Sequence, residues 1–470
     1  MYTKQLNDLE RQKRRRRWFL AGAAGSALLI IFDTQFRFYY ETVLGLDALL
    51  AASMWSIYSV WNAVNDPIYG FISDRTKSRF GRRKPYMILG AIPFGLTFFF
   101  MFVPLVDLVN ASQSTIAAYY LIILLLYDGF YALVYSNYMA LIPETFRGQD
   151  ELRRFNLSRL TIATLLSMVL TVVIPFLRIT VGDTVNMFWI GLIPGIFMPV
   201  FILLASYGTH ENPAYQKTFN TKVVTSLKQA FQNKPFLGWI SYHSMYNIGK
   251  YLMTSNVAIL AYYSIVVGSL FGMGFESLMV PVVFIVVVAM YPLWNVLFKK
   301  VTKDWTNVVC LILAMISCLM LQFSNTIYLA IGAAALMGFA QSGYSLSHDL
   351  YNARQLDYHY SKTGQRAEGS YNGIGASINS LVNMLGPWII VVIYAIGKHT
   401  TGTDPVDMTQ SALMAVRSVS GFGAALFFGV AAILATFAFK LRGDVWKNVE
   451  AAALAKDEEL KNLEQQQTAL

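Results

Sequence analysis

The chain has 470 residues, of which 55% are hydrophobic and only 14% are charged, and its mean hydropathy is +0.45. A soluble protein would carry about 25% charged residues, so this composition excludes an ordinary soluble enzyme or binding domain. The net charge of +10 is also found in nucleic-acid-binding proteins, but here the basic residues gather between apolar segments, which is typical of a membrane topology signal.

Apolar runs of about 20 residues, the length that crosses roughly 30 Å of hydrocarbon, recur along the whole chain. They predict an all-α membrane protein with twelve transmembrane helices. The expected spans are roughly 18–40, 48–73, 86–107, 115–143, 157–177, 186–207, 235–265, 276–298, 306–324, 327–350, 370–397 and 416–440.

The longest charged connection divides these spans into two sets of six. The stretches RQKRRRR, DRTKSRFGRRK and RGQDELRR fall on one side of the membrane, and poorly charged connections fall on the other. This bias predicts a multi-pass protein of the inner or plasma membrane with both termini in the cytoplasm. The expected parts are a basic N-terminus 1–17, a six-helix bundle 18–207, a middle loop 208–234, a second bundle 235–440 and a cytoplasmic tail 441–470.

The first expected span carries Asp33 and Arg37, which are four residues apart and therefore share a helix face. Charged side chains are costly inside a bilayer, so they occur there mainly in pairs or at functional sites. The two residues either pair with each other or contribute to a substrate cavity.

The second expected span holds Asp66 within the stretch WNAVNDPIYG. A carboxylate at this depth is costly unless it is paired, solvated or protonated. Asn62 lies four residues earlier on the same face, Asn65 is adjacent, and Pro67 frees a backbone carbonyl on the preceding turn. These groups predict a site for a coupling cation or proton. The alternative is a carboxylate that hydrogen-bonds another helix for packing.

A basic connection, GFISDRTKSRFGRRKP, follows directly. Asp74 stands among arginines at the helix end, and Gly70 and Gly81 allow close backbone approach. The connection is either a plain positive-inside loop or a latch whose ion pairs hold the two halves of a carrier together.

Polar residues also occur in spans four and five. Asp128 lies near an aromatic run that includes Tyr135, and it faces either a cavity or the membrane interface. Arg159 opens span five, where its guanidinium can donate to substrate oxygens or extend toward the cytoplasm.

The later spans carry a second group of polar residues. Asn379 and Asn383 share one face of span eleven with Asn372, and their amides can bond substrate hydroxyls or another helix. The roles of Lys250, His348 and Asp349 stay open, because a lone membrane histidine is more often a packing residue than a proton relay.

Four stretches of the sequence resemble motifs of a known family. The basic connection is similar to the signature that follows span two in the major facilitator superfamily. The upstream NDP, the stretch LDYHYSKTGQRAEGSY, and MALIPETF followed by Arg159 resemble one branch, the glycoside–pentoside–hexuronide:cation symporters, to which the melibiose permease belongs. The resemblance implies the major facilitator fold and alternating access between two six-helix halves. It also implies a conformational latch built from Gly70, Asp74, Arg75, Gly81, Arg82, Arg83, Arg366 and Glu368.

Within this resemblance, Asp66 and Asn65 match the coupling-ion site of the family. Asn62 stands where the sodium-using sugar permeases have a second aspartate, and Ala132 stands where they have a threonine. The loss of a charge and an oxygen ligand weakens a site for a hard cation, whereas burial favours the protonated form of a single carboxyl group. The coupling ion is therefore expected to be a proton rather than sodium.

The resemblance also places Arg159 at the sugar site. The sugar-recognising acids of the family align with Ser26 and Tyr135, and its span-ten tryptophan aligns with Ser345, beside Tyr344. The galactoside pocket is thus not present as such, and glycosides, hexoses, pentoses and uronides all stay open. The expected substrate residues are Asp33, Arg37, Asp128, Tyr135, Arg159, Tyr344, Asn372 and Asn379.

The sequence has no Walker loop, metal-ligand cluster or nucleophile elbow, so neither an enzyme nor an ATP-driven pump is expected. We expect symport of a sugar or glycoside with a cation, by a monomer in the lipid bilayer, without cofactor, bound metal or nucleic acid. The alternatives are an uncoupled facilitator, a carrier of a non-sugar amphiphile, a channel and a ligand sensor.

Overall fold

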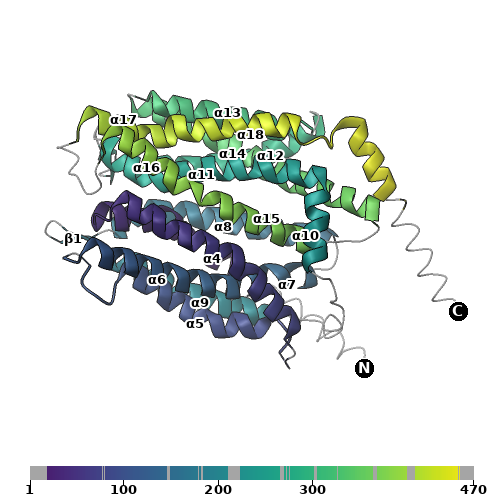
Figure 1. Ribbon diagram of the computed structural model, residues 1–470, viewed down its shortest axis with the longest axis horizontal. Coiled ribbons are helices and arrows are strands. Elements are labelled where there is room, and N and C mark those ends of the chain that lie inside the picture. The colour runs from purple at the N-terminus through teal and green to yellow at the C-terminus, as the bar shows by residue number, and fades with distance from the viewer. Residues whose placement is uncertain are drawn as a thin grey trace. The chain divides into compact units, whose positions relative to one another are not determined.

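The computed structural model consists of long helices joined by short connections (Figure 1). The structure describes residues 18–76, 78, 80–108, 110–145, 149–177, 179–181, 184–209, 223–264, 269–270, 273–274, 276–300, 304–324, 326–363, 368–399, 408–453 and 455.

The chain divides into two compact units, each assembled from several stretches of sequence. One contains residues 1–219, 252–284 and 384–419, and the other contains 220–251, 285–383 and 420–470. Helices α11 (Lys234–Ser264) and α12 (Glu276–Lys300) therefore begin in one unit and end in the other. The sequence analysis expects two bundles that are each continuous in sequence, at 18–207 and 235–440. This division stays a prediction.

The first unit contains most of the helices from the N-terminal part of the chain. Two short helices, α2 (Ala21–Ala27) and α3 (Leu29–Arg37), lead into the π-helix η1 (Phe38–Val43). The other elements are α4 (Ala48–Arg75), α5 (Lys84–Phe102), α6 (Gln113–Tyr131), η2 (Ala132–Ser136), α7 (Asn137–Thr145), α8 (Gln149–Leu177), α9 (Phe188–Gly208), α16 (Leu385–Gly397) and α17 (Gln410–Ser418).

Small residues allow close helix packing in this unit between α5 and α9, which lie side by side (Figure 1). A Cβ atom added at Gly95 would lie 2.3 Å from the backbone oxygen of Gly195, and one added at Gly191 would lie 2.9 Å from that of Phe99. Backbones that approach this closely can replace the missing hydrophobic driving force between helices in a membrane. The contact fixes α5, which in turn packs on α6.

The second unit contains α10 (Val223–Gln232), α13 (Thr306–Gln322), α14 (Ile327–Thr363), α15 (Glu368–Asn383) and α18 (Ala424–Phe437), with parts of α11 and α12. The π-helix η5 (Val419–Gly423) joins α17 to α18. A further helix covers 443–453, within the expected tail 441–470.

The prediction of an all-α architecture built from apolar helices is confirmed. Two short antiparallel ribbons were not predicted: β1 (Ile179–Val181) pairs with β2 (Thr184–Asn186), and β3 (Ser269–Leu270) pairs with β4 (Met273–Gly274). Both lie in connections, and β-branched residues of the first ribbon favour extended backbone.

Six helical stretches in the described part are long and apolar enough to cross a membrane. They are Lys84–Phe102, Gln113–Met139, Phe188–Gly208, Tyr328–Thr363, Gly373–Gly397 and Gln410–Phe437. Shorter apolar helices cover Ser158–Thr171, Val282–Trp294 and Thr306–Gln322. The number twelve therefore stays a prediction.

Candidate functional site

One face of α4 carries the polar side chains that the sequence singled out. The helix starts at Asp47, whose carboxylate accepts hydrogen bonds from the backbone N–H groups of Leu49 and Leu50 at 2.9 and 3.2 Å. This is an ordinary N-cap, which satisfies donors that the first turn leaves free. From this start, Tyr58, Asn62 and Asn65 follow at spacings of four and three residues, so they share a face.

Helix α6 brings Asp128 to that face. The helix is capped by Ser112 and ends at Tyr131, in the turn that follows Asp128, and the chain continues from there as the π-helix η2. Single π turns inside helices occur frequently at functional sites, because they shift the register of side chains along the helix. The side chain of Asp128 is only 1% exposed.

Three side chains of α4 converge on the Asp128 carboxylate. Asn62 Nδ2 donates to Oδ1 at 2.7 Å, and the Tyr58 hydroxyl donates to the same oxygen at 3.2 Å. Asn65 Nδ2 donates to the other oxygen, Oδ2. Both asparagines that the sequence predicted for ion coupling thus contact the carboxylate that it placed among the substrate residues.

The chemistry of this cluster allows it to take up a cation. The three described donors are two neutral amides and a neutral phenol, which stabilise an ionised carboxylate by hydrogen bonds without adding charge of their own. Asn65 Oδ1 is buried and accepts no hydrogen bond from the residues that the structure describes. Buried polar atoms nearly always have a partner, so this amide oxygen is available to a proton on the neighbouring carboxyl group or to a small cation.

Asp66 follows Asn65 directly in α4, but its side chain lies outside the described residues. The predicted coupling role of Asp66 therefore stays a prediction. What the structure adds is the second acid, which sequence spacing could not connect to Asn62 because the two residues are 66 positions apart.

Aromatic rings continue from Asp128 along the same helix face. Tyr127, Tyr131 and Tyr135 stack with centroids 6.2 and 5.2 Å apart, and Phe94 of α5 packs edge-on against Tyr135 at 5.9 Å. The Tyr135 hydroxyl is buried and makes no hydrogen bond within the described part of the chain. Tyr135 therefore offers a donor beside a stacked aromatic surface, as its predicted substrate role requires.

Arg37 makes its described ion pair with Glu41, one turn further along the chain, at 2.5 Å. Both side chains are buried. The guanidinium also lies over the ring of Tyr394 in α16, 5.8 Å from its centroid, and the Tyr394 hydroxyl donates to Asn256 Oδ1 at 3.0 Å. Sequence reasoning missed Glu41 because it treated Asp33, which is exposed on α3, as the nearest acid.

The remaining predicted substrate residues are spread over both units. Arg159 lies half-buried on α8, and its Nε makes no hydrogen bond to a described residue. In the second unit Tyr344 is buried on α14, and Asn379 Oδ1 on α15 accepts a hydrogen bond from Ser244 at 2.8 Å. The side chain of Asn372 lies outside the described residues.

The predicted latch is described only in part. Gly81 adopts φ +105°, a conformation that side chains disfavour, and the Ser78 hydroxyl donates to its carbonyl at 2.6 Å. Arg82 is buried and Arg83 is half-buried. The latch stays a prediction, because the surroundings of Gly70, the side chains of Asp74, Arg75 and Glu368, and the whole of Arg366 lie outside the described residues.

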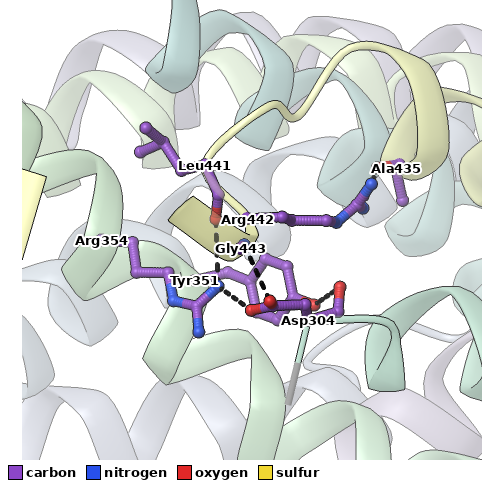
Figure 2. A network of polar contacts seen from close by, with 7 residues as sticks. All are labelled: Asp304, Tyr351, Arg354, Ala435, Leu441, Arg442 and Gly443. Atoms are coloured by element: carbon purple, nitrogen blue, oxygen red, sulfur yellow. Dashed lines mark hydrogen bonds and ion pairs between the residues drawn. The ribbon is translucent and has the colours of Figure 1, made fainter. Parts of the chain in front are cut away.

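A polar network that the sequence did not indicate joins three elements of the second unit (Figure 2). Arg354 of α14 donates from Nη1 to Asp304 Oδ1 at 2.7 Å and to the Leu441 carbonyl at 3.0 Å. The Gly443 N–H donates to Asp304 Oδ2 at 2.8 Å, and the Tyr351 hydroxyl donates to the Asp304 carbonyl at 2.5 Å. Helix α14 is thereby tied to the connections that precede α13 and follow α18.

The network sets the charge state of Asp304. Partial burial by itself would raise the pKa of this carboxyl group, but the hydrogen bonds from Gly443 and Arg354 and the positive charge of Arg354 outweigh it and lower the pKa. Asp304 therefore stays ionised and paired at physiological pH. The sequence offered only isolated charges here, because Asp304 and Arg354 are 50 residues apart.

Comparison with known proteins places the chain among transport proteins. Residues 19–442 match the model of a family described as MFS/sugar transport protein. An uncharacterized symporter of Synechocystis sp. is 35% identical over 158 residues, which are 33% of this chain and 29% of that protein. The lactose permease of Lactobacillus delbrueckii subsp. bulgaricus is 25% identical over 369 residues, which are 75% of this chain and 57% of that protein.

These two alignments cover less than two thirds of the length of either relative. Solved structures give the same fold at lower identity. The crystal structure of a D-xylose–proton symporter superimposes with a TM-score of 0.64 at 12% identity, and covers 91% of this chain and 98% of its own. A mutant of the nucleoside transporter NupG has the same TM-score, identity and coverage.

Proposed function

This chain belongs to the family of MFS/sugar transport proteins and within it to the glycoside–cation symporters, and from this premise we propose that it is a proton-coupled symporter of a sugar or glycoside. The substrate class is supported by relatives named as lactose permeases and an isoprimeverose transporter. The family premise also supports alternating access between two bundles of six helices.

The observation that carries the coupling proposal is the cluster around Asp128. A buried carboxylate receives hydrogen bonds from Asn62, Asn65 and Tyr58, and an amide oxygen of Asn65 is left over beside it. Asp66 is the next residue along α4, and we include it in the proposal as a second acid. A proton can therefore be bound at Asp128 or exchanged with Asp66.

The amide of Asn65 gives a simple device for such a step. An ionised Asp128 accepts a hydrogen bond from Asn65 Nδ2, whereas a protonated Asp128 becomes a donor. Rotation of the amide by half a turn then presents Asn65 Oδ1 to the new O–H group. Each protonation state thus has its own hydrogen-bonded arrangement, and the change moves a side chain on α4 relative to α6.

Uptake by proteoliposomes across a panel of sugars, with imposed proton or sodium gradients, tests the proposal. We expect a proton gradient to drive accumulation in the parent. Asp128→Asn and Asp66→Asn are expected to lose at least about 90% of accumulation against a gradient, since a tenfold change needs only about 1.4 kcal/mol, while exchange at equilibrium persists. Asp444→Asn, which changes an exposed acid outside the spans, serves as the matched control.

Several outcomes would contradict the proposal. Accumulation driven by sodium at constant pH without proton movement would make sodium the coupling ion. Transport that never exceeds equilibrium would make the protein a facilitator, and uptake only of non-sugar amphiphiles would change the substrate class. A ligand that binds without flux would favour a sensor.

The topology belongs to the same proposal: a monomer of the inner or plasma membrane with twelve spans and both termini in the cytoplasm. The basic connections, including the one that holds Ser78 and Gly81, support this orientation. A cysteine introduced at Ser78 should be protected from an impermeant thiol reagent added outside intact cells. Reaction from outside would contradict the orientation.

A further inference from the structure

Stacked aromatic rings connect α11 and α14 in the second unit. Trp239, His243 and Tyr246 are four and three residues apart, so they share one face of α11, and Tyr344 and His348 share a face of α14. The imidazole rings of His243 and His348 stack with centroids 4.1 Å apart, and each lies 5.3 Å from the ring of Trp239. The histidine for which the sequence gave no partner is therefore one of a pair.

The two imidazoles differ in their hydrogen bonds. His243 Nδ1 lies 3.0 Å from the hydroxyl of Tyr344, whose ring stacks on Tyr246 at 3.8 Å. His348 Nδ1 is buried and makes no hydrogen bond to any residue that the structure describes, and the same is true of Trp239 Nε1. Unpartnered polar atoms in a buried site require an explanation, and here two of them occur in one ring cluster.

Repulsion limits the charge that the pair can carry. Two positive charges about 4 Å apart repel strongly at any dielectric constant that applies inside a protein. Lys250, which also acts on His243, adds charge of the same sign from α11. In the described part of the chain, further titratable groups near the cluster are the phenols of Tyr242, Tyr246, Tyr291 and Tyr344 and the thiol of Cys310 on α13, which are neutral at physiological pH. The side chain of Asp349 lies outside the described residues.

We propose that His243 and His348 form a site for a single proton, separate from the Asp128 cluster, and that this site is loaded and emptied during transport. The inference rests on the proposed transport function. The Tyr344 hydroxyl accepts a hydrogen bond when His243 Nδ1 carries a proton and donates one when it does not, so both states are satisfied. The face of Trp239 stabilises the cationic form.

Nitrogen-15 NMR of histidine side chains in the purified full-length protein tests the site without any substrate. We expect the signals of His243 and His348 to change together as one proton is taken up. In His348→Gln the ring that competes for the proton, and that repels a second proton when it is charged, is lost, so His243 should bind its proton at a pH higher by at least about one unit, a tenfold change. His399→Gln, at a histidine outside the cluster, should leave the pair unchanged.

Independent titration of the two rings, unaffected by replacement of the neighbour, would overturn the proposal, and so would signals that do not change between about pH 4 and 9. Equilibrium exchange of substrate as a function of pH then tests the link to transport. The exchange rate of the parent should change with pH as the histidine pair gains or loses its proton. This change should be absent in His348→Gln and should occur at a different pH in Tyr344→Phe. An unchanged profile in both variants would contradict loading during transport, whereas failure of sugar uptake would leave the NMR result intact.

Discussion

Two buried acids of the first unit, Glu41 and Asp128, are held in opposite ways. Glu41 forms an ion pair with Arg37 at 2.5 Å, and that guanidinium also lies over Tyr394. Asp128 receives its described hydrogen bonds from two amides and a phenol, all of them on α4. A carboxylate inside a membrane needs stabilising partners in either case. The guanidinium stabilises Glu41 by its positive charge, whereas the amides and the phenol stabilise Asp128 by hydrogen bonds.

The difference separates a structural acid from one that can change its charge. Loss of the Glu41 charge would break the described ion pair of the buried Arg37 guanidinium, and breaking a buried ion pair is costly. The amides and the phenol around Asp128 can reorient when the carboxyl group gains a proton, because each carries both a donor and an acceptor. This difference supports the proposal that Asp128 takes part in coupling, whereas Glu41 contributes to stability through its ion pair.

Replacement of Glu41 by its amide should change the free energy of unfolding more than any other substitution considered. The same replacement of Asp128 tests directly whether the two acids differ. Glu41→Gln removes the described charge partner of the buried Arg37, so the free energy of unfolding should fall by about 3–5 kcal/mol. Asp128→Asn should cost only about 1–2 kcal/mol, because it removes hydrogen bonds but leaves no opposite charge. Thermal unfolding in detergent measures both. Equal losses would remove the distinction, and Arg37→Met combined with Glu41→Leu should recover part of the loss.

Loss of the ion pair between Asp304 and Arg354 should have an intermediate effect on the free energy of unfolding. Asp304→Asn removes a charged acceptor from Arg354 and Gly443 and should lower the free energy of unfolding by about 1.5–3 kcal/mol. Asp444, which pairs with Lys447 at 2.9 Å in the exposed tail, provides the control. Asp444→Asn should give no measurable change. A similar effect of both substitutions would mean that the network in Figure 2 adds little beyond surface charge.

Loss of one neutral donor should sharpen the description of the Asp128 cluster. Tyr58→Phe removes the 3.2 Å hydrogen bond to Oδ1 but leaves that of Asn62 to the same oxygen. Loss of this hydrogen bond should destabilise the ionised carboxylate by about 1 kcal/mol. The affinity for the coupling proton should therefore rise about fivefold. The pH at which uptake is half-maximal measures it. Tyr131→Phe on α6 controls for the loss of a hydroxyl elsewhere in the aromatic row.

The smallest effect should be the pH dependence that His399 contributes beside Arg37. Burial, and then the charge of Arg37, lower the pKa of His399 to about 4, compared with about 6.5 in an unfolded chain. The folded protein therefore binds fewer protons than the unfolded chain between these values, and stability decreases as the pH falls from about 6.5 to 4. The unfolding midpoint of His399→Gln should depend less on pH in this window. A slope equal to that of the parent would contradict the assignment.

The sequence by itself determined the class of the molecule. Hydrophobic runs, the bias of Lys and Arg between them, and the motifs near Asp66 and Arg366 are local or periodic signals, so no tertiary information was needed to predict an apolar helical transporter. The family match over residues 19–442 agrees with that prediction. The spacing of Asn62 and Asn65 on one helix face likewise followed from helix geometry alone.

Only the tertiary structure decided which groups meet across helices. Asn62 and Asp128 are 66 residues apart, Asp304 and Arg354 are 50 apart, and His243 and Tyr344 are 101 apart. Helical periodicity states which side of its own helix a residue occupies, but not which helix lies opposite or at what height. That choice depends on close packing between helices, as between Gly95 of α5 and the backbone of α9.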